Sequence, residues 1–169
     1  NGATEALSST PEDLELFLLG DEEILKKEFN DSIPSRISIH HCTEVITNHD
    51  HASRILKTKP NSSIVQGIKM VKNKHVQGFI SAGNTGSILA ASLLILGRIS
   101  GVRRPALGAY IPTRTGGKIL CDVGANPDAK PAHLVQFAIM GSNYLDHIEE
   151  QKNTRIGLVN IGEEPNKGS

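Results

Sequence analysis

The sequence carries no excess of charge of either sign. Eighteen Lys and Arg residues balance eighteen Asp and Glu residues, which gives a formal net charge of zero at pH 7. A chain without an overall positive field does not attract nucleic acid or an anionic membrane surface, so neither is predicted as its main partner. Recognition of an anion such as phosphate must therefore be local, at particular loops.

Cysteines, aromatic residues and long apolar segments are also scarce. The two cysteines, Cys42 and Cys121, lie in apolar, strand-like segments and form no CxxC pair, which favours a reducing cytosol over a disulfide-linked scaffold. The longest apolar run, residues 88–97, is too short to span a bilayer, and we expect no signal peptide. With four Phe, two Tyr and no Trp, the predicted core consists of Leu, Ile, Val and Ala.

Apolar, strand-like runs alternate with helical segments through most of the chain. Strands are predicted at residues 14–19, 36–42, 76–81, 106–111, 118–123 and 156–161. Helices are predicted at residues 1–7, 22–29, 84–98 and 131–150, with one more from a cap at residues 60–63 to about residue 72. Residues 43–59 are predicted as a polar, His-rich connection, and residues 113–117 as a hairpin turn between antiparallel strands. The alternation predicts an α/β fold, with a mostly parallel sheet and helices on both faces.

One stretch, residues 76–96, joins an apolar run to an apolar helix through the turn Ser-Ala-Gly-Asn-Thr-Gly. Gly83 and Gly86 let the backbone turn tightly and approach a ligand closely. The first turn of the helix leaves N–H groups without internal partners, and such donors favour an anion such as phosphate or carboxylate. Asn84 and Thr85 stand where either caps the helix, so contact with a ligand would be an additional role. The alternative is a compact connection that binds nothing.

Two further loops of small and polar residues follow predicted strands. One contains Asp122, Gly124 and Asn126, and the other contains Lys167. Because ligands of parallel sheets bind at the carboxyl ends of the strands, three loops on the same edge would line one cleft. Asp122, Gly124 and Asn126 otherwise need no role beyond forming a turn, and Lys167 none beyond solvation. In a cleft, the Lys167 ammonium would reach an anionic substrate.

Metal and acyl-enzyme chemistry find little support in the sequence. Five residues are of types that bind zinc, namely His40, His41, Cys42, His49 and His51. Their spacing matches no compact zinc pattern, and neighbours on a strand point to opposite faces, so we predict no metal. Cys121 has no identifiable histidine partner, and the chain contains no GxSxG motif for a serine nucleophile.

Four segments taken together carry a more specific signal than any single turn. They are Ser-Ala-Gly-Asn-Thr-Gly at residues 81–86, and residues 97–107, 122–142 and 155–168. In this order they closely resemble the PlsX family of bacterial phosphate acyltransferases, and residues 19–22 and 59–63 fit the same pattern. The resemblance covers essentially the whole chain. Against the family pattern, the chain lacks a first strand with a Met-Gly-Gly-Asp motif and roughly the C-terminal half, so residues 1–169 are expected to form one partial α/β domain.

The resemblance implies an enzyme that transfers a long-chain fatty acyl group from acyl carrier protein to inorganic phosphate and yields acyl phosphate for phospholipid synthesis. It implies a fold like the phosphotransacetylases and the isocitrate and isopropylmalate dehydrogenases, without a cofactor. It further implies a cytoplasmic homodimer with peripheral membrane attachment, whose product passes to a membrane glycerol-3-phosphate acyltransferase. Within this chain it makes Lys167 the candidate catalytic residue.

The mechanism we expect is direct displacement, in which phosphate held around residues 83–86 and by Lys167 attacks the thioester, with Asn126 or Asn84 at the oxyanion. One alternative keeps the fold but uses a short acyl-coenzyme A, as phosphotransacetylases do. A dehydrogenase is disfavoured because no ribose-binding acidic residue follows a complete dinucleotide fingerprint. A third possibility is a non-catalytic module that docks the acidic carrier protein through basic residues, the candidates being Lys57, Lys59, Arg103 and Arg104.

Overall fold

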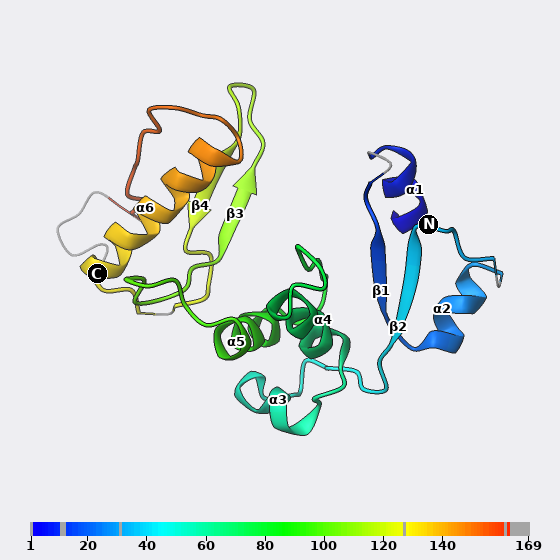
Figure 1. Cartoon of the computed structure of the whole chain (residues 1–169). Helices are drawn as coiled ribbons and strands as arrows, with labels where there is room; N and C mark the ends of the chain where they lie inside the picture. Colours follow the sequence, from blue (N-terminus) through cyan, green and yellow to red (C-terminus); the bar gives the residue numbers. More distant parts are fainter. Residues whose placement is uncertain (1, 11–12, 31, 127, 161, 163–169) are drawn as a thin grey trace. The chain divides into compact units, whose positions relative to one another are not determined.

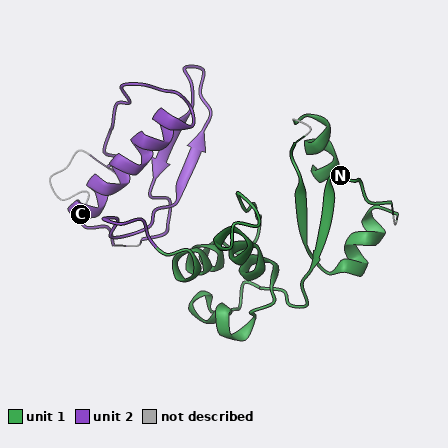
Figure 2. Ribbon diagram, viewed as in Figure 1, with its two compact units in different colours: residues 1–97 green, residues 98–169 purple. Residues whose placement is uncertain are grey.

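The computed structural model of the chain describes residues 2–10, 13–30, 32–126, 128–160 and 162 (Figure 1). The chain divides into two compact units, residues 1–97 and residues 98–169 (Figure 2). Each unit combines helices with a two-stranded sheet, so the chain is α/β, as predicted. No helix in the described parts of the chain combines the length and the apolar composition that crossing a bilayer requires.

In unit 1 the predicted order of the helices and of the first two strands is confirmed, with small differences at the ends of these elements. The elements are α1 (Gly2–Ser8), β1 (Leu16–Gly20), α2 (Glu22–Glu28), β2 (Ile37–His41), η1 (Ala52–Arg54), α3 (Ile55–Thr58), α4 (Ser63–Lys72) and α5 (Thr85–Ile95). The short helices η1 and α3 lie in the stretch that was predicted as a plain connection. They were missed because a few residues are too short for a helical period to be visible.

The strands β1 and β2 pair in parallel, with Leu16 opposite Ile37 and Gly20 opposite His41. Helix α2 connects them and starts directly after β1, because the Asp21 carboxylate caps it by accepting a hydrogen bond from the Ile24 N–H at 3.0 Å. The parallel pairing that the apolar runs predicted is therefore confirmed for these two strands. The larger, mostly parallel sheet with helices on both faces remains a prediction.

The predicted strand at residues 76–81 is not formed. These residues belong to no strand, and the Ile80 side chain is 99% exposed, whereas Phe79 packs against the core of the unit. A strand needs a neighbouring backbone to complete its hydrogen bonds. In the described part of unit 1, the strands β1 and β2 pair only with each other and leave residues 76–81 without such a neighbour.

The core of unit 1 lies where η1, α3 and α4 pack against α5. Its buried side chains are Ile55, Ile64, Val65, Ile68 and Ala91. The ring of Phe79 closes over Gly67, where an added Cβ would lie 2.2 Å from a ring carbon, so only a glycine fits there without a shift. Since α5 is packed on its neighbours from its first turns onward, the position of its N-terminus is fixed by the core.

Ser87, in the first turn of α5, leads to a prediction about stability. Its side chain is fully buried, and the hydroxyl oxygen has no hydrogen-bond partner among the described residues. An unpaired buried hydroxyl costs about 1–3 kcal/mol, and Ala favours a helix slightly more than Ser. We expect Ser87→Ala to raise the free energy of unfolding by about 1 kcal/mol, measured by urea titration.

Ser92→Ala, on the same helix but only partly buried, is the matched control for helix propensity and should be close to neutral. A loss of stability in Ser87→Ala would show instead that a water molecule satisfies the hydroxyl.

Unit 2 contains a hairpin, as predicted. Its strands β3 (Gly108–Ile111) and β4 (Lys118–Cys121) pair antiparallel, with Gly108 opposite Cys121 and Ile111 opposite Lys118. The turn at residues 113–117 that was predicted from its Thr and Gly residues connects them, and the Thr113 hydroxyl donates to the Gly116 carbonyl. The antiparallel pairing is therefore confirmed.

Helix α6 (Pro131–His147) follows the hairpin and lies against β4 (Figure 1). Pro131 occupies the first turn, as predicted, where its missing N–H costs nothing. Phe137 and Leu145 are the buried side chains of the helix. The last predicted strand is not formed over residues 156–160, which are exposed and belong to no strand, and residue 161 lies outside the described residues.

Candidate anion site at the start of helix α5

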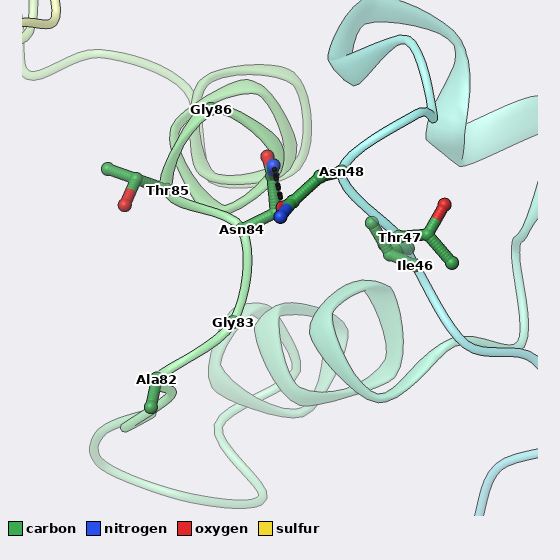
Figure 3. A pocket seen from close by; sticks show the side chains of 8 residues that line it. All are labelled: Ile46, Thr47, Asn48, Ala82, Gly83, Asn84, Thr85 and Gly86. Carbon is green, nitrogen blue, oxygen red and sulfur yellow. Dashed lines mark hydrogen bonds between the residues drawn. The ribbon is translucent and has the colours of Figure 1, made fainter.

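A hollow with a volume of about 640 Å³ lies in unit 1 between the Ser-Ala-Gly-Asn-Thr-Gly turn and the loop before η1 (Figure 3). Its lining residues come from two stretches of the chain: Ile46, Thr47 and Asn48 on one side, and Ala82, Gly83, Asn84, Thr85 and Gly86 on the other. The structure thus brings four of the predicted substrate-binding residues together at one concave site. The other wall was not foreseen.

The first turn of α5 supplies hydrogen-bond donors to this hollow. Asn84 caps the helix, since its Oδ1 accepts from the Ser87 N–H at 2.8 Å and its carbonyl accepts from the Ile88 N–H at 3.0 Å. The N–H groups of Thr85 and Gly86 form no hydrogen bond with any described residue. Two free N–H groups at the positive end of an eleven-residue helix form an arrangement that favours an anion.

The two glycines of the turn differ in how closely they are packed. A Cβ on Gly83 would lie 3.1 Å from the Ser81 hydroxyl oxygen and 3.2 Å from a side-chain carbon of Ile64, which is tighter than ordinary contact. A Cβ on Gly86 would meet its neighbours at 3.5 Å or more. Gly83 is therefore required by close packing within the protein, whereas the site at Gly86 has room for a methyl group, and close approach of either glycine to a ligand stays a prediction.

The opposite wall of the hollow is held by a carboxylate and a lysine. The Asp50 carboxylate accepts from the Thr47 N–H at 2.6 Å, from the Thr47 hydroxyl at 2.9 Å and from the Lys59 ammonium at 2.6 Å. Lys59 also donates to the Val45 carbonyl at 2.6 Å. The only local signal for this arrangement is the spacing of Thr47 and Asp50, which is that of a capping box. Lys59, predicted as a candidate docking residue for carrier protein, has its ammonium engaged within unit 1.

These contacts hold the pKa of Asp50 at about 2, well below its usual 3.8, chiefly through the hydrogen bond from Lys59 and then through the Thr47 N–H. Because the folded-state pKa is depressed, the carboxylate stabilises the fold above about pH 4, and this stabilisation is lost as the pH falls toward 2. We expect the free energy of unfolding to fall more steeply between about pH 5 and 3 in the wild-type protein than in Asp50→Asn, as measured by urea titration. Equal slopes for the two proteins would contradict the assignment.

The second predicted loop lies in unit 2 and is organised by Asp122. Its carboxylate accepts from the Leu107 N–H at 2.7 Å, from the Asn126 N–H at 2.8 Å and from the Asn126 side-chain amide at 3.2 Å. Burial raises the pKa of Asp122, but the hydrogen bonds from Leu107, Asn126 and Ala125 outweigh that effect and lower it overall. Gly124 has φ of +115°, a conformation that other residues rarely adopt. Asp122 and Gly124 therefore both shape the loop, and contact of either residue with substrate remains a prediction.

Asn126 is fixed in this loop by both of its side-chain N–H groups. The amide nitrogen donates to the Pro105 carbonyl at 2.8 Å as well as to Asp122. Donation to an oxyanion would have to replace one of these bonds, so the catalytic role predicted for Asn126 remains untested. Lys167 and the rest of the third loop, apart from Gly162, lie outside the described residues. Whether the three loops line one cleft likewise stays a prediction.

Neither cysteine has the character of a nucleophile. Cys42 is buried, and burial raises the pKa of its thiol. Burial also raises the pKa of the Cys121 thiol, and the negative charge of Asp122 raises it further. A thiol with a raised pKa forms less of the reactive thiolate. Within the described ranges, no three His, Cys, Asp or Glu side chains gather closely enough to hold a metal ion.

Comparison with known proteins identifies the family. A family described as "Fatty acid synthesis protein" matches the chain over residues 1–169. The chain is 46% identical over 158 residues to a protein named phosphate acyltransferase from Desulfitobacterium hafniense (strain Y51), covering 93% of this chain and 47% of that protein. Proteins of the same name from Halothermothrix orenii and Dictyoglomus turgidum are 45% and 46% identical and are covered to 51% and 50%, by 99% of this chain in each case.

The chain thus spans about half the length of the curated relatives that it matches. The match extends over both structural units, since it includes the Ser-Ala-Gly-Asn-Thr-Gly turn of unit 1 and the Asp122 loop of unit 2. The chain belongs to the fatty acid synthesis protein family, to which the resemblance to the PlsX phosphate acyltransferases had pointed.

Proposed function

We propose that the full-length protein transfers a long-chain fatty acyl group from acyl carrier protein to inorganic phosphate and releases acyl phosphate for phospholipid synthesis. The observation that carries this proposal is the hollow at the start of α5, where the free N–H groups of Thr85 and Gly86 match an anionic substrate. The names of the relatives, phosphate acyltransferase, support the transfer of an acyl group to phosphate. Carrier protein as the donor follows from the resemblance to the PlsX family.

The proposed reaction is a direct displacement. A phosphate oxygen attacks the thioester carbonyl carbon, and the carbonyl oxygen gains negative charge in a tetrahedral intermediate. The carbon–sulfur bond then breaks, the acyl group stays on phosphate, and the thiolate of the carrier leaves and takes up a proton. No acyl-enzyme is formed, which agrees with the unreactive character of both cysteines.

Each candidate residue has a place in this reaction. The N–H groups of Thr85 and Gly86, with Lys167, hold phosphate and reduce the entropic cost of bringing two substrates together. The amide of Asn84 has one N–H that makes no hydrogen bond with a described residue. This N–H donates to the bound phosphate and, as charge develops, to the oxyanion, whereas the Asn126 amide is engaged elsewhere. Asp122 and Gly124 set the shape of the second loop.

The remaining parts of the proposal follow from the family resemblance. They are a homodimer, a cytoplasmic location with peripheral attachment to the membrane, a fold like the phosphotransacetylases, and transfer of the product to a membrane glycerol-3-phosphate acyltransferase. The exposed side chains of Arg103 and Arg104, in the loop before β3, are candidates for contact with the acidic carrier protein.

The test is phosphate-dependent release of carrier protein from palmitoyl-acyl carrier protein by the full-length protein, with hydroxylamine to trap acyl phosphate. Acyl hydroxamate that forms only in the presence of phosphate is the expected result. Preferential use of a short acyl-coenzyme A in a competition assay would replace the proposal by a phosphotransacetylase. Carrier binding without any product would favour the docking module.

A further inference from the structure

We propose that Asn48, held in place by the Lys59–Asp50 ion pair, is a positioning residue that turns the amide of Asn84 so that it presents a donor, not an acceptor, to the bound anion. This inference rests on the proposed phosphate site and adds to it a second wall, which neither the turn motif nor the family names assign. Asn48 and Asn84 are 36 positions apart in the chain, so the contact is a property of the fold.

The first step of the argument is the contact itself. The side-chain amide of Asn84 donates to Oδ1 of Asn48 at 3.2 Å across the hollow (Figure 3). At the same time Oδ1 of Asn84 accepts from the Ser87 N–H. With its oxygen directed to the helix and one N–H directed to Asn48, the Asn84 amide keeps one further N–H that has no partner among the described residues.

The second step concerns what a different amide orientation would do. An amide rotated by half a turn would place its oxygen toward Asn48 and the hollow, and an oxygen repels a phosphate or an oxyanion. The part-buried hydrogen bond from the Ser87 N–H disfavours this rotation by about 1 kcal/mol, the usual worth of an N-cap. The acceptor on Asn48 opposes the same rotation from the other side. Asn48 thus helps to decide which end of the Asn84 amide faces the ligand.

The third step is the frame that holds Asn48. Asp50 ties Thr47, the neighbour of Asn48, to Lys59 through three hydrogen bonds. The side chains of Asp50 and Lys59 are only 19% and 25% exposed, so this pair is better shielded than an ordinary surface ion pair. The loop containing Asn48 is therefore tied to Lys59, which lies between α3 and α4, the helix that packs against α5.

The beginning of the same loop is anchored as well. The Glu44 carboxylate accepts from the Asn61 N–H at 2.6 Å, and Glu44 forms a short bridge with Ser62, the fully buried N-cap residue of α4. One wall of the hollow is thus attached to the start of α4 and the other forms the start of α5, and these two helices pack against each other. Such a frame holds donors to a fixed geometry at little entropic cost when the ligand binds.

The experiment is a double-mutant cycle on the full-length protein, with the KM for phosphate as the measured quantity. We expect Asn48→Ala to raise this KM about tenfold, and Asp50→Ala to raise it by a similar factor. If Asp50 acts through Asn48, adding Asp50→Ala to Asn48→Ala changes the KM by less than about twofold.

A matched control separates this role from general stabilisation. Glu22 forms an ion pair of 2.7 Å with Lys26 on the exposed face of α2, in the same unit. Glu22→Gln should leave the KM for phosphate unchanged. The melting temperature of every variant is measured in parallel. We expect Asp50→Ala to lower it by the same amount in the wild-type protein and in Asn48→Ala. Effects of Asp50 and Asn48 on the KM that multiply would overturn the inference, because they would be independent.

A second measurement needs no turnover. The side-chain NH2 signal of Asn84 in the 15N-labelled full-length protein, assigned by its loss in Asn84→Ala, should shift on addition of inorganic phosphate and should also shift in Asp50→Ala without phosphate. A protein that makes no acyl phosphate but shows both shifts would refute the proposed function and support the positioning role. An Asn84 signal that ignores Asp50→Ala would refute the positioning role even in an active enzyme.

Discussion

Replacement of Lys167 by Ala is expected to lower turnover by about a hundredfold or more in the full-length protein. An ammonium that stabilises the charge developing on the attacked carbonyl or the phosphate acts most strongly in the transition state, where that charge is greatest. A hundredfold loss corresponds to about 2.7 kcal/mol at 1.36 kcal/mol for each factor of ten. The measurement is kcat and KM for phosphate in the hydroxamate assay.

Lys152 offers a matched control for this variant. Its side chain is 71% exposed, and its ammonium pairs with Asp146 at 2.8 Å on the surface of unit 2. Lys152→Ala removes the same charge and the same methylene chain, and turnover should be unchanged. Near-normal turnover in Lys167→Ala would exclude Lys167 from the catalytic step. A rise in the KM for phosphate at constant kcat would instead make it a binding residue only.

Local rules account for the parts of the fold that the sequence could predict. Asn84 caps α5, Pro131 stands in the first turn of α6, and Asp21 caps α2, because each of these residue types has a strong preference for its position. The parallel pair of β1 and β2 follows from apolar runs separated by a helix. In each of these cases the deciding interaction joins residues a few positions apart, or a periodic pattern spans the whole element.

The predictions that failed, and the contacts that were missed, depend on residues far apart in the chain. Residues 76–81 and 156–160 have the composition of strands, yet a strand also needs a neighbour to pair with, and composition does not reveal one. The Asn48–Asn84 hydrogen bond and the ion pair of Lys59 with Asp50 have no periodic signature either. The sequence therefore singled out the Ser-Ala-Gly-Asn-Thr-Gly turn, for which anion binding stays a prediction, but not the wall that faces it.

Asp122→Ala is expected to lower the free energy of unfolding by about 2–4 kcal/mol. The carboxylate, just after β4, is bonded to two other places in unit 2, since one oxygen accepts from Leu107 ahead of β3 and the other from Asn126. Alanine leaves these partly buried N–H groups without a partner. Each hydrogen bond to a charged group is worth about 1.5–3 kcal/mol, although partial exposure to water reduces the sum. Urea titration of the full-length protein is the measurement.

Asp146→Ala provides the comparison, because Asp146 is a carboxylate of the same unit whose partners are the exposed side chains of Lys152 and His147. A surface ion pair of this kind contributes about 0–1 kcal/mol, so a loss as large as that of Asp122→Ala would contradict the role given to the Asp122 hydrogen bonds. Asp122→Asn keeps one acceptor oxygen but turns an NH2 group toward an N–H donor, so it should recover only part of the stability.

Activity then separates the two roles that Asp122 can have. If Asp122 only shapes the loop, the remaining folded fraction of Asp122→Asn retains its KM for both substrates, and turnover falls in proportion to the amount of folded protein. If the carboxylate also contacts substrate, the KM rises at a temperature where the variant is fully folded. Gly124→Ala tests the same loop without touching a hydrogen bond, because a Cβ there meets no atom of a described residue within 4 Å and only the backbone at φ of +115° is strained. A rise in KM in that variant as well would mean that the shape of the loop, and not the Asp122 charge, is what the substrate requires.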